Sequence, residues 1–85
     1  MSYELSKKVN RRGFEWELID QGDDDKFYQC RGEVIYDDEH DQIPEPALWA
    51  AAHELSAMLL NNGVHSNVSH SEKGWVEVNI VNRSK

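Results

Sequence analysis

The sequence predicts an α+β fold with the element order β-β-α-β-β, in which an antiparallel four-stranded sheet carries one helix packed on one face. Three patterns support this prediction. Apolar residues alternate with polar ones in two separate regions, and between these regions apolar residues recur at helical spacing. Two hairpins joined by one helix are typical of an antiparallel sheet with the helix across one face. Whether the hairpins form one sheet or meet across a dimer interface is left open.

The first alternation lies in Phe-Glu-Trp-Glu-Leu at residues 14–18, where the apolar side chains share one side and the glutamates the other. This period is that of a half-buried strand. Residues 21–25, Gln-Gly-Asp-Asp-Asp, have the composition of a turn. Residues 27–36 then form the second strand of a hairpin, and Gly32 within it indicates a bulge.

The helix is the clearest element of the chain. Residues 37–42 form an acidic loop, and Pro44-Glu45-Pro46 opens a helix over residues 47–61, because proline is tolerated in a first turn and glutamate suits the positive helix end. Gly63 supplies the C-terminal stop. The apolar stripe at helical spacing consists of Leu48, Ala51, Ala52, Leu55, Met58 and Leu59.

The second hairpin pairs residues 64–70 with residues 75–81 around a Ser-Glu-Lys-Gly turn. Val76, Val78 and Ile80 fall on one side of the later strand. We expect this side to meet the helix, because both surfaces are apolar.

Residues 13–85 are expected to form a single α+β domain, and residues 1–12 to be either a polar basic arm or a short edge strand. A chain of 85 residues buries only about 60–65% of the surface that its unfolded form exposes. With Cys30 as the only cysteine, no intramolecular disulfide is expected. No secretory signal and no membrane span are predicted, so the expected location is cytoplasmic.

Charge is distributed unevenly along the chain. The segment from Glu15 to Glu45, which we call the acidic band, contains twelve acidic residues and two basic ones. Its net charge is therefore −10, whereas that of the whole chain is −7. Residues 1–14 carry four bases against one acid, and residues 46–85 are balanced. The sequence pI of about 4.9 argues against membrane lipid or nucleic acid as a direct ligand, despite the basic N-terminal residues.

The acidic band has two interpretations. It can imitate nucleic acid phosphates and occupy a basic groove on another protein, since alternate strand carboxylates stand about 6.7 Å apart, near twice the axial rise per phosphate of one DNA strand. Alternatively it is a solvated face that keeps a small protein soluble. The acidic residues proposed to bind a partner are Glu15, Glu17, Asp23, Asp24, Asp25, Asp37, Asp38, Glu39 and Asp41.

Aromatic residues extend this candidate surface. Trp75 falls on the side of its strand opposite the predicted helix-facing valines, and Trp49 lies beside the helix stripe rather than within it. Exposed tryptophans are enriched at protein interfaces. Each is therefore a candidate partner-binding residue. The alternative is that Trp75 packs over its own sheet face or against the N-terminal residues.

The sequence predicts no metal site, no cofactor and no catalytic site. The acidic loop lacks the ligand spacing of a calcium loop, and no strained nucleophile turn or phosphate-binding loop is present. His65 and His70 lie five residues apart on one strand, which directs them to opposite faces. The alternative hypothesis is nevertheless a small metal-binding protein or enzyme centred on His65, His70 and Cys30.

These features together predict a small acidic, non-catalytic protein-binding module. It would act by occupying a surface of a partner that is itself basic or handles nucleic acid, in the sharper version as a nucleic-acid-mimic inhibitor. Electrostatic steering by the acidic band would accelerate such an encounter. A homodimer is compatible with the exposed edge strands of the predicted sheet.

Overall fold

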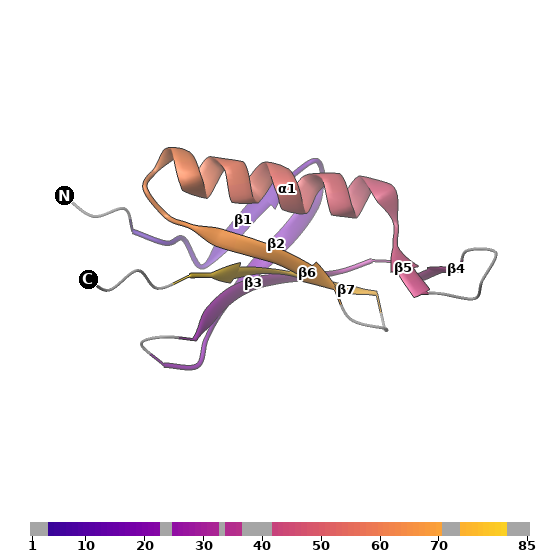
Figure 1. Ribbon diagram of the computed structural model, residues 1–85, viewed down its shortest axis with the longest axis horizontal. Helices are drawn as coiled ribbons and strands as arrows, with labels where there is room; N and C mark the ends of the chain where they lie inside the picture. Colours follow the sequence, from indigo (N-terminus) through magenta and orange to yellow (C-terminus); the bar gives the residue numbers. More distant parts are fainter. Residues whose placement is uncertain (1–3, 23–24, 33, 37–41, 71–73, 82–85) are drawn as a thin grey trace.

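The computed structural model describes residues 4–22, 25–32, 34–36, 42–70 and 74–81 (Figure 1). One helix packs on an antiparallel sheet, as predicted, but the sheet has five strands rather than four, in the order β1-β2-β3-β7-β6. A separate two-stranded sheet is formed by β4 and β5. The elements are β1 (Lys8–Arg11), β2 (Phe14–Asp20), β3 (Lys26–Arg31), β4 (Val34–Tyr36), β5 (Gln42–Pro44), α1 (Pro46–Asn61), β6 (Ser66–His70) and β7 (Trp75–Ile80).

The fifth strand is β1, which pairs with β2 from Lys8 opposite Glu17 to Arg11 opposite Phe14. The two strands are joined by Arg12 and Gly13 alone, with φ angles of 55° and 84°. A two-residue loop with both φ angles positive matches the right-handed twist of the strands it connects, so it closes a hairpin directly. The four-strand prediction was wrong because this turn and its short polar strand lack a strong apolar signal.

The N-terminal hairpin is tied to the rest of the molecule by polar contacts. The backbone N–H of Leu18 donates to the Lys7 carbonyl (2.8 Å), and the Tyr28 hydroxyl donates to the Ser6 carbonyl (2.6 Å). Arg12 Nε lies 3.3 Å from a carboxylate oxygen of Glu54 on α1. The segment before β2 is therefore fixed at both the sheet and the helix.

The predicted strand over residues 27–36 is two strands in the structure. β3 ends at Arg31, and β4 pairs with β5 instead of continuing the main sheet. Gly32 lies at the break, where an added Cβ would stand 2.5 Å from Leu48 Cδ2. Any other residue would force the buried Leu48 side chain to shift, so glycine lets the chain pass this close to the start of α1.

Helix α1 spans Pro46–Asn61 and ends as the sequence predicts. The Val64 N–H donates to the Leu59 carbonyl (2.8 Å), and the Gly63 N–H donates to the Leu60 carbonyl (2.9 Å). Gly63 has a φ of 83°. These two bonds and the left-handed glycine form a Schellman motif, which satisfies the last helix carbonyls and turns the chain toward β6.

The two predicted hairpins belong to one sheet, which answers the question that the sequence left open. β7 lies between β6 and β3 and is antiparallel to both. The register of β3 and β7 places Val76 opposite Cys30, and Val78 opposite Tyr28. The strand from the C-terminal hairpin thus completes the core begun by the N-terminal strands.

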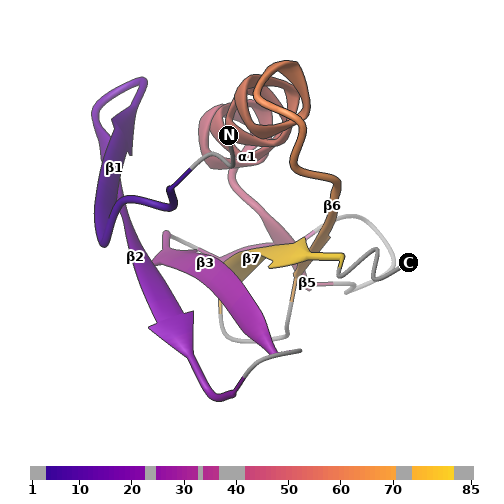
Figure 2. The same cartoon turned by 90° about the vertical axis from the view of Figure 1, so that its left-hand side faces the viewer.

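The core lies between α1 and one face of the sheet. Trp16, Tyr28, Val76 and Val78 are fully buried there, and the helix contributes the predicted stripe, in which Leu48, Ala51, Ala52, Leu55 and Leu59 are also fully buried. Figure 2 shows α1 over this face with β1 curling toward the helix. Within the described ranges, no helix is long and apolar enough to cross a membrane.

Candidate functional site

Among the elements that the structure describes, no helix or strand covers the face of the sheet opposite α1, which we call the open face (Figures 1 and 2). Strand alternation puts Glu15 and Glu17 of β2 on this open face, because Trp16 between them is buried in the core. Cross-strand register then sets Glu17 opposite Gln29, and Gln29 opposite Glu77. The open face therefore carries glutamates in β2 and β7, and the same alternation places the apolar residues Ile19, Phe27 and Trp75 on it.

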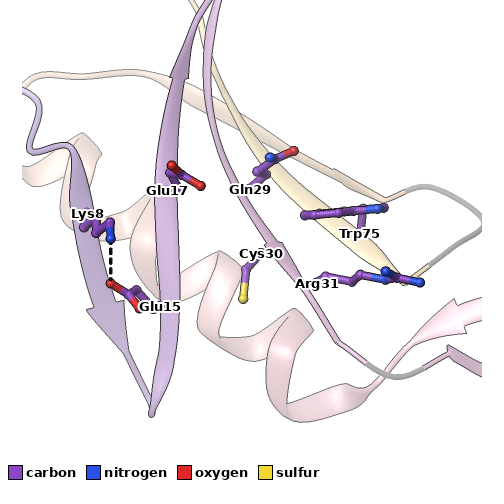
Figure 3. A pocket seen from close by; sticks show the side chains of 7 residues that line it. All are labelled: Lys8, Glu15, Glu17, Gln29, Cys30, Arg31 and Trp75. Carbon is purple, nitrogen blue, oxygen red and sulfur yellow. Dashed lines mark ion pairs between the residues drawn. The ribbon is translucent and has the colours of Figure 1, made fainter.

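A depression of about 200 Å³ lies in the open face, and Figure 3 shows its walls. It begins where the β2–β3 pairing ends, at Glu17 and Gln29. Its lining consists of Lys8, Glu15, Glu17, Gln29, Cys30, Arg31 and Trp75. Because these residues are carried by four strands of one sheet, the shape of the depression is set by the sheet rather than by loops.

Two positively charged side chains line part of this depression. The Arg31 guanidinium lies over the Trp75 ring, 5.8 Å from its centroid, which is within the range of a cation–π contact. Lys8 Nζ stands 3.8 Å from Glu15 Oε2, and both side chains are more than 60% exposed. An ion pair so exposed contributes little to stability. The depression thus presents an aromatic ring together with charges of both signs.

Cys30 lies on the core side of β3 and reaches the depression where β2 and β3 diverge (Figure 3). It is a free thiol, only 9% exposed. Burial, assisted by the negative charges of Glu45 and Glu15, raises the pKa of the Cys30 thiol above its ordinary value. The thiolate needed for nucleophilic chemistry is therefore disfavoured at neutral pH.

We expect Cys30 to react with a disulfide reagent at pH 7.5 much more slowly than it does in the urea-unfolded chain.

The raised pKa of the Cys30 thiol also makes the stability of the fold depend on pH. Above about pH 8.5 the unfolded chain loses this proton while the folded protein keeps it, so the free energy of unfolding falls with rising pH. Urea titrations of wild type and Cys30→Ala between neutral and alkaline pH isolate this effect. Equal slopes for the two proteins would contradict it.

The structure brings together three of the residues predicted to bind a partner: Glu15, Glu17 and Trp75 all line the depression. Asp25 does not belong to it, because it lies in the turn between β2 and β3, where its N–H donates to the Gly22 carbonyl. The other predicted acidic residues, Asp23, Asp24, Asp37, Asp38, Glu39 and Asp41, lie outside the described residues.

Trp49 is remote from the depression. It lies on α1 at the side of β6, and its ring makes edge contacts with His53 (5.1 Å between centroids) and His70 (5.4 Å). Trp49 is half-buried, whereas both histidines are exposed. The two tryptophans proposed as partner contacts therefore belong to different surfaces.

Cys30 and His70, two of the candidate ligands of the alternative metal-site hypothesis, lie far apart. Register places Cys30 opposite Val76, and Val76 opposite His70, so the cysteine and histidine are two strands apart, about 10 Å. A shared zinc ion would need both ligands at about 2.0–2.3 Å. Within the described ranges, no group of three or more metal-binding side chains is assembled.

Sequence reasoning missed Lys8, Gln29 and Arg31 as members of the surface. Lys8 belongs to the segment predicted as either a basic arm or a short edge strand, and no role in binding was predicted for Gln29 or Arg31. The available signal was alternation: Gln29 and Arg31 flank buried Cys30, which places both on the open face.

No family model, curated protein or solved structure matches this chain. The geometry and charge of the open face are therefore the basis for the functional proposal.

Proposed function

We propose that this chain is a small, non-catalytic protein-binding module that docks the open face of its sheet onto a basic surface of a partner protein. The observation that supports this most directly is the depression, in which Arg31 of β3 lies over the ring of Trp75 of β7, next to the carboxylates of β2. An aromatic side chain set among polar groups in a concave surface is the arrangement found at the centre of many interfaces.

Rigid backbone favours this use of the face. Glu17, Gln29 and Glu77 occupy adjacent positions across three paired strands. Strand pairing already restricts their backbone, so docking would require little additional ordering beyond the side chains themselves. Binding energy would come from desolvating Trp75, while the carboxylates would select a partner with complementary charge.

The net negative charge of the chain should affect the rate at which a partner is met more than the strength of the final contact. The chain carries a net charge of −7, which attracts a basic partner over about one Debye length at physiological salt. Within the depression, Lys8 and Arg31 oppose the charges of Glu15 and Glu17. A partner cation would therefore have to exchange with Lys8 or Arg31 to pair with these glutamates.

Nucleic-acid mimicry is the sharper form of the proposal. Glu15 and Glu17 lie on one side of β2, about 6.7 Å apart, which is near twice the axial rise per phosphate of one DNA strand. The partner would then be a nucleic-acid-handling protein, and the module would inhibit it by occupying its binding groove. Competition distinguishes this form: a short DNA duplex should displace the module from its partner.

The proposal can be tested by capture of partners from lysate at low and high salt, using wild type and the double variant Glu15→Gln, Glu17→Gln. We expect a basic protein to be retained by wild type at low salt and released at high salt, and to bind the double variant at least tenfold more weakly. A control, Glu4→Gln with Glu54→Gln, changes the net charge equally at residues that do not line the depression, although it also removes the exposed Arg12–Glu54 ion pair. It should retain the partner better than the open-face variant.

Equal loss in the two double variants would show that only net charge matters, which contradicts docking through the open face. A partner that is retained at unchanged affinity by the Glu15 and Glu17 variant would contradict the role of these carboxylates. Circular dichroism of each variant establishes that the fold is kept.

A further inference from the structure

The outer edge of β6 is an unpaired strand edge. β6 ends the sheet order, and within the described ranges no strand lies beyond it. The Val81 N–H donates to the His65 carbonyl (2.8 Å), which fixes the alternation of the antiparallel β6–β7 ladder. Asn67 and Ser69 therefore direct their backbone groups toward β7, whereas Ser66, Val68 and His70 direct theirs outward.

The other end of the sheet differs in chemistry. β1 has the sequence Lys-Val-Asn-Arg, and charged residues, lysine above all, discourage pairing at an edge. β6 has the sequence Ser-Asn-Val-Ser-His, without lysine, arginine, acid or proline. Of the two edges of this sheet, β6 is the one without a protective charge.

We propose that two copies of this chain associate through β6, antiparallel about a twofold axis at Val68, so that their sheets join into one continuous sheet. In this register Val68 faces its own counterpart, and Ser66 faces His70 of the second copy. Because these are the residues with outward backbone groups, each facing pair can exchange two N–H···O bonds. The strand is thus self-complementary in the way that a twofold interface requires.

Helix α1 adds side chains to this edge. Trp49 contacts His70, and the Ser56 and Ser66 hydroxyls are 2.6 Å apart, so one side of the helix follows β6. Leu60 lies four residues after Ser56 and hence on the same side of the helix, with 55% of its surface exposed. In the proposed dimer both helices lie on the same face of the joined sheet, where Trp49 and Leu60 become further buried.

Charge also favours a second copy as the occupant. Residues 46–85, which include α1 and β6, contain three acids and three bases, whereas the excess negative charge lies earlier in the chain. The two copies can therefore meet without concentrated repulsion at the contact. Salt should leave this association unchanged or strengthen it by screening the −7 charges of the two copies, the opposite of its effect on the proposed open-face partner.

Sedimentation equilibrium tests the interface with one proline variant in each edge strand. Val68→Pro removes an outward N–H from β6, and Asn10→Pro removes an outward N–H from β1. The Asn10 N–H points outward because the hydrogen bond from the Leu18 N–H to the Lys7 carbonyl fixes which residues of β1 pair with β2. At concentrations up to about 1 mM, which detects even weak association, wild type and Asn10→Pro should dimerise and Val68→Pro should remain monomeric.

Cysteine cross-linking keeps the test decisive if a proline variant fails to fold. Facing residues in a hydrogen-bonded pair have Cα atoms about 5.5 Å apart, which suits a disulfide. Mild oxidation should therefore give a covalent dimer with Val68→Cys and little with Asn10→Cys. A wild-type protein that stays monomeric over the whole concentration range would overturn the proposal, and so would a dimer that is lost in Asn10→Pro but kept in Val68→Pro.

Discussion

Replacing Trp16 by alanine is expected to lower the free energy of unfolding by about 3–5 kcal/mol. Trp16 is fully buried and is the largest side chain of the core, so alanine would leave a cavity that α1 and the sheet could only partly close. A domain of this size has a total stability on the order of 5–10 kcal/mol. Urea titration should therefore show a transition shifted to much lower denaturant, or a protein already partly unfolded in water.

Trp16→Phe provides the matched control. Phenylalanine keeps much of the apolar volume and removes the indole N–H, which is buried without a hydrogen-bond partner in this structure. We expect Trp16→Phe to retain more than half of the stability that Trp16→Ala loses. Equal losses for the two variants would mean that the indole ring, rather than buried volume, determines stability at this position.

Replacing Trp75 by alanine should weaken partner binding by about 30-fold or more, corresponding to roughly 2 kcal/mol. Trp75 is half-buried and is the aromatic residue that lines the depression, so its removal takes away the aromatic contact available there. The fold should tolerate the change, because Trp75 lies on the opposite side of the sheet from the core. Titration of the captured partner, monitored by calorimetry, measures the affinity.

Trp49→Ala is the control for this prediction. Trp49 is also half-buried, but it contacts His53 and His70 at the side of β6. Its removal should leave the affinity for an open-face partner unchanged and weaken self-association instead. Loss of partner binding in Trp49→Ala, with none in Trp75→Ala, would transfer the docking site to the helix side.

Regular patterns made much of the fold predictable. The helix combines an apolar stripe with a glycine stop, and both appear in the structure as buried leucines and a Schellman motif. The C-terminal hairpin was equally clear, because Val76 and Val78 alternate with polar residues. Local sequence sufficed wherever apolar period and turn chemistry agreed.

β1 and the break at Gly32 were not predictable in the same way. β1 has one apolar residue, Val9, and its turn places Arg12 at a positive φ, which arginine seldom adopts. At Gly32 the determining contact is the approach of Leu48, 16 positions later in the sequence. Strand pairing and helix docking, rather than local propensity, set both features.

The candidate surface was predictable in part. Alternation alone placed Glu15, Glu17 and Trp75 away from the core, but their convergence depends on β7 lying beside β3, which only the three-dimensional topology supplies. The same topology brings Lys8 and Arg31 among the carboxylates. The candidate surface, predicted from the sequence as an acidic band with two tryptophans, is consequently of mixed charge in the part that the structure describes.

Hydroxyl-radical footprinting of the three tryptophans tests most directly whether the open face contacts the partner. Trp16 is fully buried and serves as an unreactive internal reference, while half-buried Trp49 and Trp75 report the helix side and the open face. We expect the captured partner to protect Trp75 and to leave Trp49 as reactive as in the free protein. Protection of Trp49 with Trp75 unchanged would contradict docking through the open face.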